Sequence, residues 1–76
     1  MTTPSLAQAS ESTRSELEAR VNRVTELWRA NVDARAMFLK HGSEANLERS
    51  VSAERAYQEG AKAFYAWCVE NKIGAA

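Results

Sequence analysis

Cys68 and His41 are the side chains of this 76-residue sequence that could serve as a nucleophile and its general base. An imidazole can take a thiol proton only when the two groups lie within hydrogen-bond reach. The helices expected below separate them by about 40 Å in one chain, at 1.5 Å of rise per residue. An antiparallel dimer would bring His41 of one copy towards Cys68 of the other, but no acid that could orient the histidine is evident. The pattern therefore favours a packing role for the cysteine and a helix end for the histidine.

Arg35, Asn31 and Tyr57 form the second group of residues that could do chemistry. If the helices associate, these three side chains could line a polar pocket that holds an anionic or nucleotide-like ligand. Polar residues within an apolar stripe more commonly set the register and oligomeric state of helices, at some cost in stability. Both interpretations stay open at this point, with the structural one favoured.

Metal and cofactor chemistry is not expected. One cysteine and one histidine cannot supply a Cys/His zinc set, and a single thiol cannot close an intrachain disulfide. The sequence contains no glycine-rich phosphate loop and no pair of catalytic carboxylates. We therefore predict a protein that is not an enzyme and that needs no cofactor.

The charge balance also limits the partners. Ten lysines and arginines balance ten aspartates and glutamates, so no net field attracts nucleic acid or an anionic membrane. Three oppositely charged pairs are four residues apart, the spacing of solvated ion pairs on a helix: Glu16 with Arg20, Arg29 with Asp33, and Arg55 with Glu59. No segment approaches the roughly 20 apolar residues of a membrane span, and the N-terminus lacks the pattern of a signal peptide. The expected compartment is the cytoplasm.

Two long helices account for nearly all of the chain. Thr13 stands three residues before Glu16, the spacing of a capping box, and Gly42 can adopt the left-handed conformation that ends a helix. The first helix is therefore predicted over about 14–41. Residues 1–12 are an N-terminal arm, either helical or disordered, because Thr3 and Pro4 could also begin a helix.

A second helix is predicted over about 44–73, with Ser43 as its N-cap and Gly74 at its end. The break between the helices is so short that they should lie antiparallel, so residues 13–76 form one helical hairpin of the all-α class. With the turn centred between residues 42 and 43, residues whose numbers sum to about 85 should lie at the same height. The expected pairs are Phe38 with Leu47, Ala34 with Val51, Trp28 with Tyr57, Val24 with Ala61, Val21 with Phe64, and Leu17 with Cys68.

Each predicted helix carries two apolar stripes, of which a hairpin can bury only one. On the second helix we assign Leu47, Val51, Ala61, Tyr65 and Cys68 to the intrachain contact, and Ala53, Tyr57, Gly60, Phe64 and Trp67 to the further stripe. The further stripe needs a partner, and a second copy would give a homo-oligomer, with a dimeric four-helix bundle favoured. Trp67→Ala is then expected to dissociate the protein, whereas Phe64→Ala should unfold it, because Phe64 is also placed at the height of Val21 within the hairpin. The residues expected at an interface with another copy or another protein are Trp67, Phe64, Tyr57, Trp28, Leu27 and Phe38.

These features favour a small, non-enzymatic protein–protein interaction module. The kind of protein expected is a phage or bacterial inhibitor or regulator that acts by binding a target protein. An oligomer that sequesters a small anionic or nucleotide ligand is the alternative, and a weak nucleic-acid-binding regulator is the third possibility.

Overall fold

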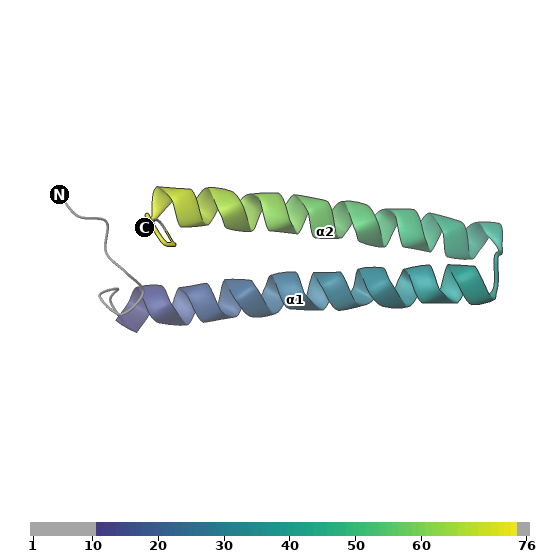
Figure 1. The fold of residues 1–76 in the computed structure, drawn as a ribbon, viewed down its shortest axis with the longest axis horizontal. Helices are drawn as coiled ribbons and strands as arrows, with labels where there is room; N and C mark the ends of the chain where they lie inside the picture. The colour runs from purple at the N-terminus through teal and green to yellow at the C-terminus, as the bar shows by residue number, and fades with distance from the viewer. Residues whose placement is uncertain (1–10, 75–76) are drawn as a thin grey trace.

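The computed structural model describes residues 11–74, which form a hairpin of two α-helices. Helix α1 spans Glu11–Lys40 and helix α2 spans Glu44–Glu70. The two lie antiparallel and side by side along their whole length, so the molecule is a rod of 54 × 17 × 17 Å (Figure 1). The predicted all-α helical hairpin is confirmed, and no strand occurs within the described residues.

Helix α1 begins before the residue predicted to cap it. Glu11 and Ser12 are already helical, so Thr13 lies inside the helix rather than at its N-cap. Extending the helix adds backbone hydrogen bonds and places Glu11 in the first turn, where the helix dipole favours a negative charge. The alternative start at Thr3 and Pro4 lies outside the described residues.

The turn between the helices depends on Ser43. It has an extended backbone, with φ −81° and ψ 159°, and its Oγ accepts a hydrogen bond of 3.1 Å from the backbone N–H of Asn46. The Asn46 side-chain amide donates in turn to the carbonyl oxygen of His41 at 2.7 Å. The predicted cap is therefore confirmed. The left-handed conformation expected of Gly42 is wrong, because these hydrogen bonds reverse the chain without a positive φ there.

The C-terminal end of α2 is a Schellman motif centred on Lys72. The helix ends at Glu70 rather than near 73. The backbone N–H of Ile73 donates to the carbonyl of Cys68 at 2.9 Å, and that of Lys72 donates to the carbonyl of Val69 at 3.2 Å. Lys72 has φ 56°, the left-handed conformation that glycine adopts at least cost. The sequence suggested Gly74 for this role, but the chain leaves the helix earlier.

Lys72→Gly is expected to raise the free energy of unfolding by about 1 kcal/mol, because glycine removes the steric cost of the left-handed conformation. Urea denaturation followed by circular dichroism measures the change. Lys62→Gly is the matched control: Lys62 lies exposed in the interior of α2, where glycine should lower stability by a similar amount. A loss of stability in both variants would contradict the role given to Lys72.

The line of contact between the helices, here called the seam, is regular. Most shielded residues recur at spacings of three and four, which is the heptad pattern of a coiled coil, with Ala61 and Cys68 partly shielded beside this line. On α1 the seam consists of Leu17, Arg20, Val24, Leu27, Asn31, Ala34 and Phe38. On α2 it consists of Asn46, Ser50, Ala53, Tyr57, Gly60, Phe64 and Trp67.

The assignment of the α2 stripes was wrong for most residues, because the stripe expected to need a partner packs on α1, while Leu47, Val51 and Tyr65 are exposed. Ala61 and Cys68 of the stripe assigned to the intrachain contact are partly buried. Burying the rings of Phe64 and Trp67 removes more apolar surface from water than burying Leu47 and Val51 would. The predicted register, in which residues whose numbers sum to about 85 lie at the same height, was right for Trp28 and Tyr57. Their ring centroids are 5.0 Å apart. The predicted partner of Phe64, Val21, is instead exposed.

The Leu27 side chain packs against the backbone of Gly60 near the middle of the seam. A Cβ atom on this residue would collide with Cδ1 of Leu27 on α1. Even so, the seam shields little: the buried residues within the described range are Ala34, Trp67 and Asn31, and none of its side chains is completely inaccessible. The hairpin by itself has almost no core.

Candidate interaction surface

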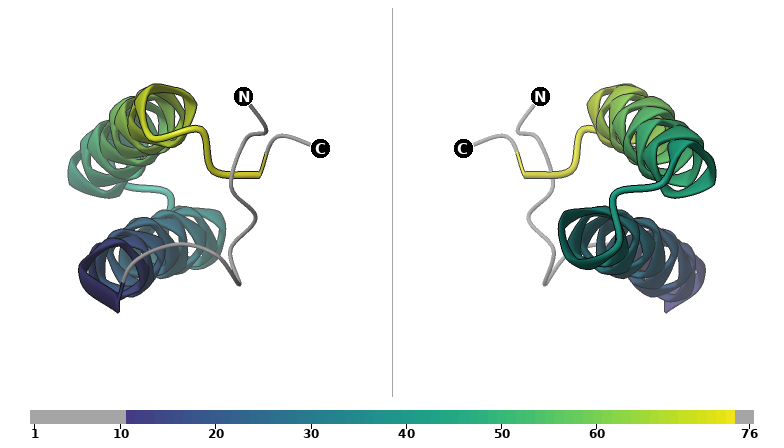
Figure 2. Two further views of the ribbon diagram at one scale, coloured as in Figure 1. Left: turned by 90° about the vertical axis from the view of Figure 1, so that its left-hand side faces the viewer. Right: turned by 90° about the vertical axis from the view of Figure 1, so that its right-hand side faces the viewer.

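The two helices present two broad sides, one on each flank of the seam (Figure 2). Because the helices are antiparallel, a residue that directly follows a seam position lies on the same side of the hairpin whichever helix it comes from. A residue that directly precedes a seam position lies on the opposite side. The chemical character of each side can therefore be read from the residues next to the seam.

One broad side carries seven exposed large apolar side chains, here called the apolar face, with Thr25, Arg35, Glu54 and Gln58 between them. Its members directly follow seam residues and are between 43% and 77% exposed. They extend from the turn to the open end of the rod and come from both helices. The apolar face consists of Val21, Trp28, Val32 and Leu39 on α1, and Leu47, Val51 and Tyr65 on α2.

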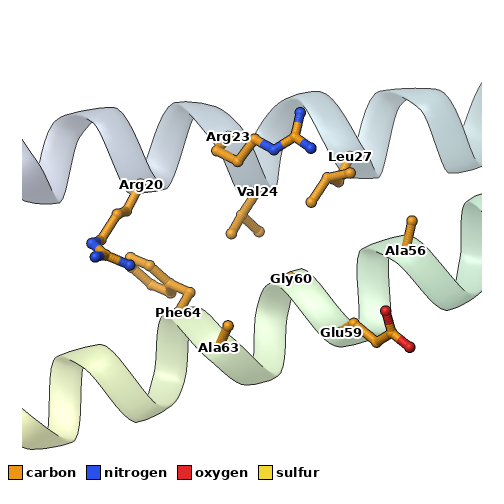
Figure 3. A pocket seen from close by; sticks show the side chains of 9 residues that line it. All are labelled: Arg20, Arg23, Val24, Leu27, Ala56, Glu59, Gly60, Ala63 and Phe64. Atoms are coloured by element: carbon orange, nitrogen blue, oxygen red, sulfur yellow. The ribbon is translucent and has the colours of Figure 1, made fainter.

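The opposite side carries small and charged side chains together with Met37 and is hollowed by shallow grooves. The groove in Figure 3 is floored by Val24, Leu27 and Gly60 and bordered by charged side chains. Arg23 and Glu59 lie on opposite borders and carry opposite charges, so this groove does not select a ligand of one sign. A second groove near the turn is lined by Ala30, Asp33, Ala34, Met37, Arg49 and Ala53.

Arg20, at the open end of the rod, is engaged within the hairpin. Its guanidinium carbon lies 4.7 Å from the centroid of the Trp67 ring, and Nη2 donates to Oε1 of Glu16 at 2.9 Å. The ion pair between Glu16 and Arg20 is thus confirmed. This arrangement is a structural clamp on Trp67, and it leaves Arg20 poorly placed to bind an anion in the neighbouring groove.

Most residues predicted for an intermolecular interface lie in the seam instead. Trp67 is only 9% exposed, and its ring stacks on Phe64 at a centroid distance of 6.5 Å. Tyr57, Leu27 and Phe38 are half-buried seam residues as well. Trp28, which is 50% exposed, is the one predicted residue on the apolar face. Its neighbours there were missed because both stripes have helical spacing, and spacing alone does not say which one is buried.

The residues of the predicted polar pocket are only partly brought together. Asn31 and Tyr57 are both seam residues, whereas Arg35 is exposed on the same side of the hairpin as the apolar face. Asn31 is 7% exposed, and its Oδ1 atom has no hydrogen-bond partner. An unpaired oxygen accepts hydrogen bonds and repels negative charge, so this atom does not favour an anionic ligand. Ligand binding at these residues stays a prediction.

The candidate nucleophile and base are far apart. His41 directly follows α1 at the turn, whereas Cys68 lies near the end of α2 at the opposite end of the rod (Figure 1). Cys68 is a free thiol. Across residues 11–74, no three histidine, cysteine or acidic side chains are grouped closely enough to hold a metal ion. Neither described helix has the length and apolar character needed to cross a membrane.

No protein-family model, curated protein or solved structure matches the chain.

Proposed function

We propose that the protein is a non-enzymatic protein–protein interaction module and that the apolar face is its binding surface. The observation that carries this proposal is that seven of the exposed large apolar side chains gather on one side of both helices. Exposed hydrophobic residues scattered singly are ordinary, but a contiguous patch rimmed by polar residues marks a site of association. The opposite side of the same hairpin, lined by charged and small residues, lacks such a patch.

The stability of the hairpin supports the same conclusion. A domain of this size buries only about 60% of its unfolded surface and commonly relies on disulfides, metals or association. Cys68 is unpaired, and the described residues hold no candidate metal cluster. Since the seam buries so few side chains, a partner on the apolar face would supply the missing core.

The form of the face indicates the shape of its partner. Apolar side chains separated by four and seven residues along a helix, as Val21, Trp28, Val32 and Leu39 are, fit the apolar stripe of another helix. A partner that docks here therefore presents one or more amphipathic helices. A small module of this kind regulates a target by occupying its surface, and the free thiol suits a reducing compartment such as the cytoplasm.

A pair of matched charge substitutions tests the proposal. Val32 on the apolar face and Met37 on the opposite side are 46% and 44% exposed, so lysine at either position should leave the helices intact. Tagged wild-type protein and both variants would be used to capture proteins from a lysate of the source organism. Val32→Lys should reduce the specifically captured protein at least tenfold, whereas Met37→Lys should retain it. Equal capture by all three proteins, or equal loss in both variants, would contradict the proposal.

A further inference from the structure

We propose that a second copy of this chain covers the apolar face, in antiparallel orientation, about a two-fold axis that crosses the face at the height of Ala30 and Ala56. The inference rests on the proposed function, because it names the partner of the same surface. It also goes further, since it fixes which helix meets which and at what register.

The stripe on α1 is symmetric in chemical character about residue 30. Positions equidistant from this centre hold the same kind of side chain, apolar opposite apolar and polar opposite polar. When two copies of α1 pack antiparallel about this centre, every member of the stripe therefore meets a compatible residue. The pairs are Val21 with Leu39, Thr25 with Arg35, and Trp28 with Val32.

The stripe on α2 has the same property about residue 56. Apolar residues again oppose apolar ones, and the two long polar side chains oppose each other. Arg35 lies opposite Thr25 and Glu54 opposite Gln58, so neither of these charges meets a like charge across the axis. The pairs are Leu47 with Tyr65, Val51 with Ala61, and Glu54 with Gln58.

The two centres lie at the same height in the hairpin, which a single axis requires. Contacts across the seam join residues whose numbers sum to 85 for Trp28 with Tyr57 and to 87 for Arg20 with Trp67. Residues 30 and 56, the centres of the two stripes, sum to 86, so they too lie at the same height along the rod. One two-fold axis therefore serves both helices, although the two stripes are separate stretches of sequence.

The other simple two-fold arrangement fits less well. An axis along the rod would place α1 of one copy against α2 of the other at equal heights. Val32 would then face Glu54, and Arg35 would face Val51, so apolar side chains would be buried against charges. The antiparallel arrangement avoids both mismatches.

The available area suits a stable dimer. A 30-residue helix is about 45 Å long, and two helices side by side are about 20 Å wide, so the face offers roughly 900 Å². Specific interfaces bury about 800 Å² from each partner. The result is a four-helix bundle in which every neighbouring pair of helices is antiparallel.

Mass measurement by analytical ultracentrifugation at about 10 μM tests whether a second copy covers the apolar face. The wild type should have twice the chain mass of 8.4 kDa. Val32→Lys, close to the axis, should weaken the dimer at least tenfold, and Met37→Lys should leave it unchanged. A fully helical wild-type monomer, or a dimer unaffected by Val32→Lys, would overturn the proposal; the face would then belong to residues 1–10 of the same chain or to another protein.

Orientation is tested by a spin label on His41→Cys in a Cys68→Ser background. The antiparallel dimer places the turns at opposite ends, so the labels should be about 33 Å apart or more. A distance under about 20 Å would overturn the antiparallel arrangement. If the wild type is monomeric but Val32→Lys still abolishes capture from the lysate, the proposed function stands without this inference. A dimer that captures no other protein would support this inference and contradict the binding of a separate target protein.

Discussion

Trp67→Ala is expected to lower the free energy of unfolding by about 3–5 kcal/mol, enough to unfold much of a marginally stable hairpin. Trp67 is the largest of the buried side chains and closes the seam near the open end. Its loss would leave a cavity beside Phe64 and remove the aromatic surface under the Arg20 guanidinium. From sequence alone, this variant was expected to dissociate and retain its helicity. The burial of Trp67 within one chain reverses that expectation.

Thermal and urea denaturation followed by circular dichroism would measure the Trp67→Ala effect. Val69→Ala is the matched control, because Val69 lies two residues away on the outer surface of α2 and is 59% exposed. Its stability should change by less than about 1 kcal/mol. Full helicity in Trp67→Ala, with dissociation as the main effect, would show that the ring serves an intermolecular contact after all.

Asn31→Leu is expected to raise the free energy of unfolding by about 1–3 kcal/mol. The Asn31 side chain occupies a seam position, and its buried Oδ1 has no partner to replace the water it loses. Leucine has similar size and no polar atom, so it removes this cost and adds apolar contact. A polar residue at a single seam position also helps to specify register, which leucine would not. The more stable variant should therefore populate additional associated species.

Denaturation and mass measurements on the same samples would separate these two effects of Asn31→Leu. Asn22→Leu is the control, because Asn22 is exposed on the outer side of α1 and leucine there should change stability little. If Asn31→Leu is destabilising, the amide must have a partner, and that partner would be sought in the second copy near the two-fold axis.

Helix-capping and turn preferences predicted the parts of this fold that depend on a few neighbouring residues. Ser43 caps α2 as its side chain dictates, and the short turn forces the antiparallel hairpin whose register brings Trp28 to Tyr57. The same preferences were less successful at helix ends with several candidates. Gly42 was suitable as the left-handed residue that ends α1, but it has no positive φ. Gly74 was suitable for the same role at the end of α2, yet Lys72 occupies it, stabilised by hydrogen bonds back to Cys68 and Val69.

The choice between the two stripes could not be made from local sequence. Both have helical spacing, and both contain aromatic residues. What decides between them is the fit between helices: Gly60 leaves room for Leu27, and Trp67 reaches the Arg20 guanidinium across the seam. These contacts join residues more than 30 positions apart, so the apolar face could be located only once the packing was known.

The start of α1 and the end of α2 lie at the same end of the rod, opposite the turn (Figure 1). Tension applied between these two points would therefore act across the helices rather than along them. The seam would peel apart from the open end, one heptad after another, and each contact would carry the load alone. The first strong contact to bear that force is the Arg20 guanidinium over the Trp67 ring. The force needed to open the single hairpin is thus set mainly by the contact between Arg20 and Trp67. The turn at Ser43 would be the last part to open.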